Sequence, residues 1–256
     1  MKFKRIQFKF QMSVKFIDEE WSWKTMTLWD YLCEGNYPSK WQDFFLREDI
    51  QKDLKEISEK IVDESKDCTL YPPIEKVFRA YMLPLEKIRV IVIGQDPYAS
   101  PGSAVGICFS IPPGSPTNPS LRNIYNELES EGYTPNQNGS LLPWVAQGCF
   151  MINSSLTVEK GNPECHVHIW YNFTEKVLKH ISSSTKNVAW LLMGAKALAF
   201  KNCIDEKKGH KTFVTSHPSP LSAYKGFRDY PAFVGSGMFR QVNDFLEKSG
   251  REKILW

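Results

Sequence analysis

Four short apolar runs constrain the fold of this chain more strongly than any other sequence feature. Stretches with helical spacing lie between or after these runs, at residues 121–131, 170–182 and 238–248. Continuous apolar runs are typical of strands buried on both faces, and strands that alternate with helices favour parallel pairing. The pattern predicts an α/β fold: a single domain with a central four-stranded, mainly parallel sheet and helices on both faces. The four runs are residues 87–94 (KIRVIVIG), 149–153 (CFMIN), 188–194 (VAWLLMG) and 212–216 (TFVTS).

A polar, turn-forming segment follows each of the four predicted strands. In open parallel sheets, ligands bind outside the carboxyl ends of the strands. The sequence therefore predicts a site where these segments meet, in the order Gln95-Asp96-Pro97, Asn153-Ser154-Ser155, Gly194-Ala195 and His217-Pro218-Ser219.

The length and composition favour one large domain behind a short extension. The chain has 256 residues, of which 42% are hydrophobic and 24% charged, enough to bury a substantial core. An amphipathic helix is expected within residues 47–66. We predict a catalytic domain at residues 31–256 and a basic extension at residues 1–30. The first sixteen residues have five basic side chains and no acidic one, without the apolar core of a secretory signal.

The role of this extension stays open at the sequence level. It suits a basic arm for an anionic partner, a targeting element or an added strand. The strand is suggested by Ile6, Phe8, Phe10 and Met12, which alternate with polar residues. An intracellular location, nuclear or cytoplasmic, is the main expectation, and mitochondrial targeting is a less favoured alternative.

The cysteines and the hydropathy disfavour several classes of protein, whereas the net charge decides little. The net charge of +3 neither demands nor excludes a polyanionic partner. The six cysteines are scattered singly without a CxxC pair, which favours a reducing compartment over a disulfide framework. The longest apolar stretch, residues 188–200, contains Lys196 and is too short to cross a bilayer, so no membrane association is expected.

Two of the polar segments contain residue types that suit catalysis. GQDPYAS at residues 94–100 places Asp96 and Tyr98 after a buried strand, and SHPSPLSAY at residues 216–224 does the same for His217. An Asp-Pro pair alone is more often a turn, and a lone histidine is more often a cap or a core residue. Only the combination of several such segments supports a functional interpretation.

Five segments occur together in a fixed order, and over most of residues 71–256 they resemble family 1 uracil-DNA glycosylases. The resemblance implies a metal-free monomer without a cofactor that hydrolyses the N-glycosidic bond of deoxyuridine in single- and double-stranded DNA. The products would be free uracil and an abasic site, the first step of base excision repair. It also suggests that a uracil-mimicking inhibitor protein could occupy the DNA groove. The segments are GQDPY, the expected strand end at Phe109-Ser110, PSLRNIY, MINSSLTV and HPSPLS.

The resemblance also implies two catalytic residues. Asp96 matches the aspartate that orients or activates the attacking water and stabilises positive charge on the sugar. His217 matches the histidine that donates a hydrogen bond to uracil O2 as negative charge collects on the leaving base. A neutral imidazole suffices for this role.

Four further residues would form the uracil pocket. The side-chain amide of Asn153 would pair with uracil O4 and N3–H, whereas cytosine presents the reverse pattern. Phe109 would stack on the base, and Tyr98 would lie against C5, where thymine has a methyl group. Gln95 would contribute mainly through its backbone amide.

The DNA backbone would be bound by a separate set of residues. Leu221 matches the apolar wedge that fills the gap left by the flipped nucleotide. Ser120, Ser219 and Ser222 would contact phosphates, and Lys225 would add positive charge.

Three positions depart from the family pattern. Ala99 stands where histidine is usual, Ala195 where serine is common, and Lys225 where arginine is expected. The first two remove hydrogen bonds near the water or the phosphates. These departures leave open a DNA-binding or replication-scaffold protein with little catalysis.

Other classes are weaker alternatives. A related glycosylase acting on other damaged bases is disfavoured by Tyr98 and Asn153. A nucleotide-binding enzyme is disfavoured because no P-loop or GxGxxG fingerprint is present. Cys165, His166 and His168 look like metal ligands, but no fourth ligand is evident, so we expect no metal site.

Overall fold

A computed structural model describes residues 22–256, and its centre is a four-stranded parallel sheet. All three neighbouring pairs are parallel. Gly94, the last residue of β2, lies opposite Asn153, the last residue of β3. The predicted sheet is confirmed. Its strands lie in the order β3 (Cys149–Asn153), β2 (Val90–Gly94), β5 (Ala189–Met193) and β6 (Lys211–Thr215).

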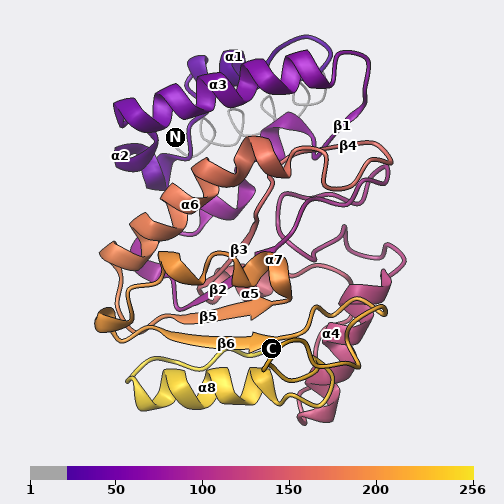
Figure 1. Cartoon of the computed structure of the whole chain (residues 1–256), viewed down its shortest axis with the longest axis vertical. Helices are drawn as coiled ribbons and strands as arrows, with labels where there is room; N and C mark the ends of the chain where they lie inside the picture. Colours follow the sequence, from indigo (N-terminus) through magenta and orange to yellow (C-terminus); the bar gives the residue numbers. More distant parts are fainter. Residues whose placement is uncertain (1–21) are drawn as a thin grey trace, which may run out of the picture.

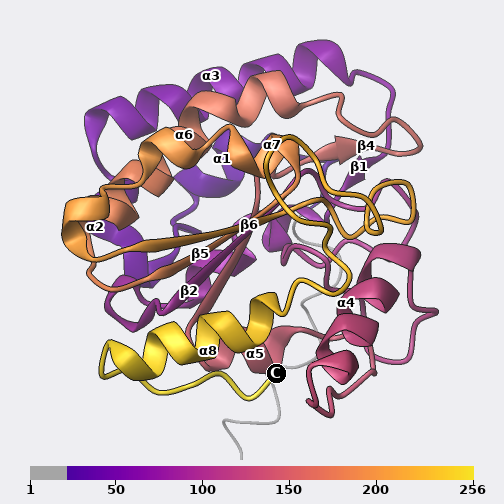
Figure 2. The ribbon, with the colours of Figure 1, turned by 60° about the horizontal axis from the view of Figure 1, so that its bottom comes forward.

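Helices cover both faces of the sheet, as predicted (Figures 1 and 2). On one face, α3 (Glu48–Glu64) packs against α6 (Val167–Ser184), and the short α2 (Gln42–Phe45) packs beside them. On the other face lie α5 (Leu142–Ala146) and α8 (Met238–Lys248). None of the described helices is long and apolar enough to span a bilayer.

Two helices lie near the carboxyl ends of the strands. The first, α4 (Pro119–Ser130), begins after Asn118, whose side chain accepts a hydrogen bond from Leu121 N–H. The second, α7 (Ala195–Leu198), starts immediately after β5 and Gly194. Because both helices begin at this edge, their first residues lie on the side of the sheet where ligands are expected.

Described residues on the amino-terminal side of the expected domain boundary at residue 30 pack with the domain. Helix α1 (Leu28–Cys33) crosses that boundary, starts with a capping box between Thr27 and Asp30, and buries Leu28. The indole of Trp23 donates a hydrogen bond to the Pro72 carbonyl. Residues 1–21 of the predicted extension, including the alternating apolar residues, lie outside the described residues.

Several short elements have no counterpart in the sequence prediction. An antiparallel pair joins β1 (Leu70–Tyr71) to β4 (Val158–Glu159). Two-residue strands are too short to give a periodic signal. Short 3-10 helices form at Ser39–Trp41, Ile74–Lys76, Arg79–Met82, Leu85–Lys87, Lys201–Cys203 and Glu206–Lys208.

Candidate active site

A small cavity of about 210 Å³ opens at the carboxyl edge of the sheet. The ends of β2, β3 and β6 and the first turn of α4 all reach it, although the corresponding segments are far apart in the sequence. All six residues predicted for catalysis and uracil binding line this cavity, together with one predicted phosphate contact. The lining residues are Gly94, Gln95, Asp96, Pro97, Tyr98, Ala99, Phe109, Ser120, Asn153, Pro163 and His217.

The carboxylate of Asp96 is half-buried and held by two donors. Its Oδ2 accepts a hydrogen bond from Glu164 N–H at 2.7 Å, and its Oδ1 accepts one from Gln95 Nε2 at 3.2 Å. Burial raises the pKa of Asp96 above its ordinary value, and these two hydrogen bonds partly offset the rise. The result is a fixed carboxylate in a low-polarity setting, suited to orienting water or stabilising a nearby cation.

The imidazole of His217 is oriented by its own loop. Its Nδ1 accepts a hydrogen bond from Ser219 N–H at 3.1 Å, so in the neutral ring the proton is on Nε2. Burial lowers the pKa of His217. A neutral imidazole that donates from Nε2 is therefore the favoured form at neutral pH.

Tyr98 and Phe109 form the aromatic wall of the cavity. Tyr98 Oη donates a hydrogen bond to the Phe109 carbonyl at 3.1 Å, which fixes the tyrosine ring. Burial raises the pKa of the Tyr98 phenol, so the group stays protonated as a donor. The Phe109 ring lies 5.8 Å from the His217 ring, centroid to centroid.

The expectation that Phe109 ends a strand is wrong. Phe109 lies in a turn with φ of +61°, a left-handed conformation that is unusual for a bulky side chain. This conformation ends any extended backbone and costs on the order of 1–3 kcal/mol. It places a large ring, only 9% exposed, in the wall of the cavity.

Asn153 reaches the cavity across the end of the neighbouring strand. Its register partner on β2 is Gly94, and a Cβ there would overlap Asn153 Oδ1 and lie 2.7 Å from Cys108 Cβ. Glycine at position 94 therefore makes room for the amide. No described residue makes a hydrogen bond to the Asn153 side chain, so its donor and acceptor are available to a ligand.

The predicted DNA-contacting residues divide into two groups. Ser120, in the first turn of α4, lines the cavity. The others lie on the loop after His217 and do not line it. In that loop Ser219 Oγ and Ser222 Oγ lie 3.0 Å apart, and Ser222 Oγ donates to the His217 carbonyl at 2.9 Å. Lys225 is exposed at the far end of the loop.

Leu221 is the most exposed large apolar side chain of this loop. It is 92% exposed, and Tyr224 beside it is 65% exposed. The serine hydrogen bonds fold the loop back on His217, while Leu221 extends into solvent. An apolar side chain held in this way is available to enter a partner molecule.

The structure adds two residues that the sequence did not indicate. Pro163 lines the cavity, and Glu164 supplies the backbone donor to Asp96. A backbone N–H leaves no residue-type signal, and 68 positions separate the donor from its acceptor. Sequence reasoning had no means of finding this contact.

The cysteine and the two histidines of the CHVH segment make hydrogen bonds or an ion pair with other residues of the protein. Cys165 and His166 gather with Glu159, a set that could hold a metal ion, whereas His168 pairs with Glu64 at 3.1 Å. Both ring nitrogens of His166 are engaged, Nε2 with Ser65 at 2.8 Å and Nδ1 with Thr157 at 2.9 Å. As arranged, the imidazole has no free nitrogen for a metal.

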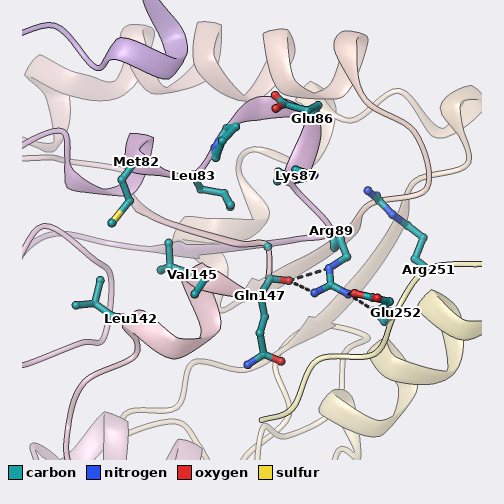
Figure 3. A pocket seen from close by; sticks show the side chains of 13 residues that line it. Met82, Leu83, Glu86, Lys87, Arg89, Leu142, Val145, Gln147, Arg251 and Glu252 are labelled. Carbon is teal, nitrogen blue, oxygen red and sulfur yellow. Dashed lines mark hydrogen bonds and ion pairs between the residues drawn. The ribbon is translucent and has the colours of Figure 1, made fainter.

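A larger groove lies at the opposite, amino edge of the sheet (Figure 3). It has a volume of about 710 Å³, and Arg89 and Gly148 on its wall directly precede β2 and β3. Its arginines already serve the fold. Arg89 binds the Gln147 carbonyl, and Arg251 binds the carbonyls of residues 186 and 187. The groove lacks a carboxylate–imidazole pair comparable to that of the smaller cavity.

The sheet and the cavity define a class: an α/β fold with a small cavity at the carboxyl ends of its strands, lined by a carboxylate, an amide and an imidazole. Comparisons with known proteins name the family. Residues 82–243 match the profile of the Uracil DNA glycosylase superfamily. The chain therefore belongs to this superfamily.

Individual relatives agree with the family profile. A uracil-DNA glycosylase of Pseudomonas paraeruginosa is 39% identical over 216 residues, covering 82% of this chain and 90% of the relative. That of Psychromonas ingrahamii is 42% identical over 191 residues, covering 73% and 85%. The crystal structure of mimivirus uracil-DNA glycosylase superposes with a TM-score of 0.78 at 29% identity, covering 86% of this chain and 87% of the other. A variant of the mimivirus protein in complex with UGI, an inhibitor protein, has the same TM-score and identity and covers 86% and 88%.

Proposed function

We infer that this chain is a uracil-DNA glycosylase, a hydrolase that removes uracil from DNA and leaves an abasic site. Family membership and curated relatives at about 40% identity support the activity. The observation that carries the inference for this chain is the convergence of Asp96, Asn153 and His217 on one small cavity. Release of free uracil from an oligonucleotide that contains deoxyuridine tests the inference.

Base recognition follows from the groups that face the cavity. We propose that the Asn153 amide pairs with O4 and N3–H of an extruded uracil, which Phe109 stacks against. Cytosine presents a donor where uracil has O4, so it would leave the amide mismatched and unpaired groups buried. Tyr98 closes the space beside C5. The pocket thereby selects uracil by both hydrogen bonding and shape.

Bond cleavage is assigned to Asp96 and His217. As the glycosidic bond lengthens, the sugar gains positive charge and the uracil gains negative charge. The ionised Asp96 carboxylate stabilises the sugar cation and orients the water that attacks it. His217 Nε2–H donates to uracil O2 and stabilises the departing anion. The glycosidic bond breaks and the uracil anion leaves. The water adds to the sugar carbon and loses one proton, which balances the proton that the uracil anion takes up.

Activity should fall on the acidic side of neutrality in two overlapping steps. Burial raises the pKa of Asp96, so the ionised form is lost as pH falls through a value above that of an ordinary aspartate. Burial lowers the pKa of His217, so its protonation, which removes the acceptor for Ser219 N–H, comes below its ordinary range. A profile of kcat against pH measures this. A rate that stays constant down to the ordinary range of a solvated aspartate would contradict the role of Asp96.

We assign the contacts with the DNA backbone to the first turn of α4 and to the loop after His217. Ser120 lies where helix N–H groups and the helix dipole favour a phosphate. Ser219 and Ser222 present small hydroxyls on the same side, and Lys225 adds charge. These contacts bind single- and double-stranded DNA without reading its sequence.

Leu221→Ala should slow uracil removal from duplex DNA more than from single-stranded DNA. The wedge is needed only in a duplex, where it fills the gap that the flipped nucleotide leaves in the base stack. Because Leu221 is 92% exposed, we expect no loss of thermal stability. Single-turnover rates on the two substrates give the comparison, and equal slowing on both would argue against a wedge.

Two assignments concern partners. A solved relative is in complex with the inhibitor protein UGI. We propose that a uracil-mimicking inhibitor protein of this kind also binds this chain, over the Leu221 loop and the mouth of the cavity. We further propose that the enzyme acts as a monomer, because the cavity is built from one chain.

A further inference from the structure

One residue outside the predicted site connects the Asp96 carboxylate to a second element. Glu164 donates its backbone N–H to Asp96 Oδ2 at 2.7 Å, the shorter of the two hydrogen bonds to this carboxylate. Glu164 takes a left-handed conformation with φ of +70°, which is unfavourable for a residue with a side chain. Such strain persists only where the surroundings hold it, and it concentrates at functional sites.

The side chain of Glu164 is tied to the end of a different strand. Its Oε2 pairs with Lys196 Nζ at 2.7 Å. Lys196 lies in α7, which starts directly after β5, whereas Asp96 follows β2. Glu164 and Lys196 side chains are 49% and 54% exposed, so the pair contributes little to overall stability. Its geometric effect is local: it ties the residue that donates to Asp96 to the first turn after β5.

The residues that follow Glu164 are held by hydrogen bonds on the side away from the cavity. Val167 N–H donates to the Glu164 carbonyl at 3.2 Å, and the buried His166 joins Ser65 to Thr157. Glu159 N–H donates to Cys165 Sγ at 3.3 Å. The backbone after residue 164 is thus well anchored. On the side of the cavity, the Glu164 side chain is held mainly by Lys196, and Gln95 adds a weaker contact.

We propose that Glu164 and Lys196 are a positioning pair that holds the Asp96 carboxylate for the reaction and balances the charge beside it. The proposal rests on the catalytic role assigned to Asp96. Neither side chain is needed to touch uracil, since Glu164 acts through its N–H and Lys196 acts through Glu164.

The charges that face Asp96 make the proposal measurable. Glu164 is negative and raises the pKa of Asp96, whereas Lys196 is positive and lowers it, both by smaller effects than burial. Gln95 is neutral and lowers the pKa of Asp96 by its hydrogen bond, while Cys165 and the neutral His217 add no charge. Removing the Lys196 charge therefore raises the pKa of Asp96 both through charge and through a looser N–H donor, whereas removing the Glu164 charge sets these two effects against each other.

The test compares Lys196→Met with Glu164→Gln in the full-length enzyme. Lys196→Met leaves an uncompensated carboxylate, so the acidic limb of kcat should move to higher pH. Glu164→Gln removes the negative charge beside Asp96, which lowers the pKa of Asp96, but it also loosens the N–H donor, which raises it, so the limb should move less than in Lys196→Met. Both should lower kcat at neutral pH on the order of tenfold, because small displacements of a catalytic group cost up to about a hundredfold. KM should change little.

A matched pair on α6 serves as the control. Lys179 and Glu175 pair at 2.9 Å with similar exposure, and neither is among the charges acting on Asp96. Lys179→Met and Glu175→Gln should leave kcat and the acidic limb unchanged. Thermal unfolding of all four variants checks that they fold.

The outcomes separate this proposal from its rivals. An acidic limb in Lys196→Met that coincides with that of the wild type, or that moves no further than the limb of Glu164→Gln, would overturn it. A raised KM with a weaker salt dependence in Lys196→Met and unchanged kcat would also overturn it, making Lys196 a phosphate contact. Full activity of Asp96→Asn would reject the catalytic role of Asp96 itself. This result does not depend on how Lys196→Met or Glu164→Gln behaves.

Discussion

Asp96→Asn is expected to reduce kcat by at least about 10²-fold, the lower end of what a positioned acid–base group contributes. The amide has nearly the shape of the carboxylate, so Glu164 N–H keeps an acceptor and Gln95 can present its oxygen to the new donor. The negative charge, however, is lost. Without it the sugar cation is not stabilised and the water has no fixed acceptor.

Single-turnover cleavage of an oligonucleotide containing deoxyuridine measures this effect, with DNA affinity and thermal unfolding recorded beside it. We expect unchanged affinity and unfolding temperature, because Asp96 does not contribute to the wedge or to the phosphate contacts. An Asp96→Asn rate within about tenfold of the wild type would be too small a loss for the assigned role.

Tyr98→Gly should allow the enzyme to release thymine. The Tyr98 ring lies in the cavity wall and is fixed by its hydrogen bond to the Phe109 carbonyl at 3.1 Å, so it cannot readily turn aside for a methyl group. Removing the ring opens space beside C5. The uracil rate should also fall, because the shortened side chain no longer packs against the base.

Tyr98→Phe is the matched control for this substitution. It loses the hydrogen bond to Phe109 but keeps the ring, so it should continue to exclude thymine. Both variants are compared on oligonucleotides that differ only in uracil or thymine. Absence of thymine release by Tyr98→Gly, with uracil release retained, would remove Tyr98 as the steric gate.

The central sheet could be predicted because its strands are buried on both faces. Every residue of β2, β3 and β5 is buried, and burial of both faces demands the unbroken apolar runs that the sequence contains. The order of the strands could not be predicted in this way. An apolar run is compatible with several neighbours, and the choice is made by packing of the connecting helices.

The sequence predicted those residues of the cavity whose functional groups are side chains at the ends of strands. Asp96, Asn153 and His217 stand directly at strand ends, and parallel pairing brings such ends to one edge. The turn at Phe109 was missed because its left-handed conformation is set by tertiary packing rather than by residue type.

Hydrogen bonds from backbone groups to site residues could not be predicted from the sequence either. The hydrogen bond from Glu164 to Asp96 depends on a strained conformation and on an ion pair with Lys196, neither of which follows from spacing. In contrast, the Thr27–Asp30 capping box is a local signal that marks the start of α1. The expected boundary at residue 30 overlooked it.

The most direct test of the central claim is the release of free uracil from a labelled oligonucleotide with one deoxyuridine, in the presence of EDTA. An oligonucleotide with thymine at the same position is run in parallel. The account predicts free uracil and an abasic strand from the first substrate and no base from the second. Binding of the deoxyuridine oligonucleotide without release of uracil would contradict it and would favour a DNA-binding scaffold.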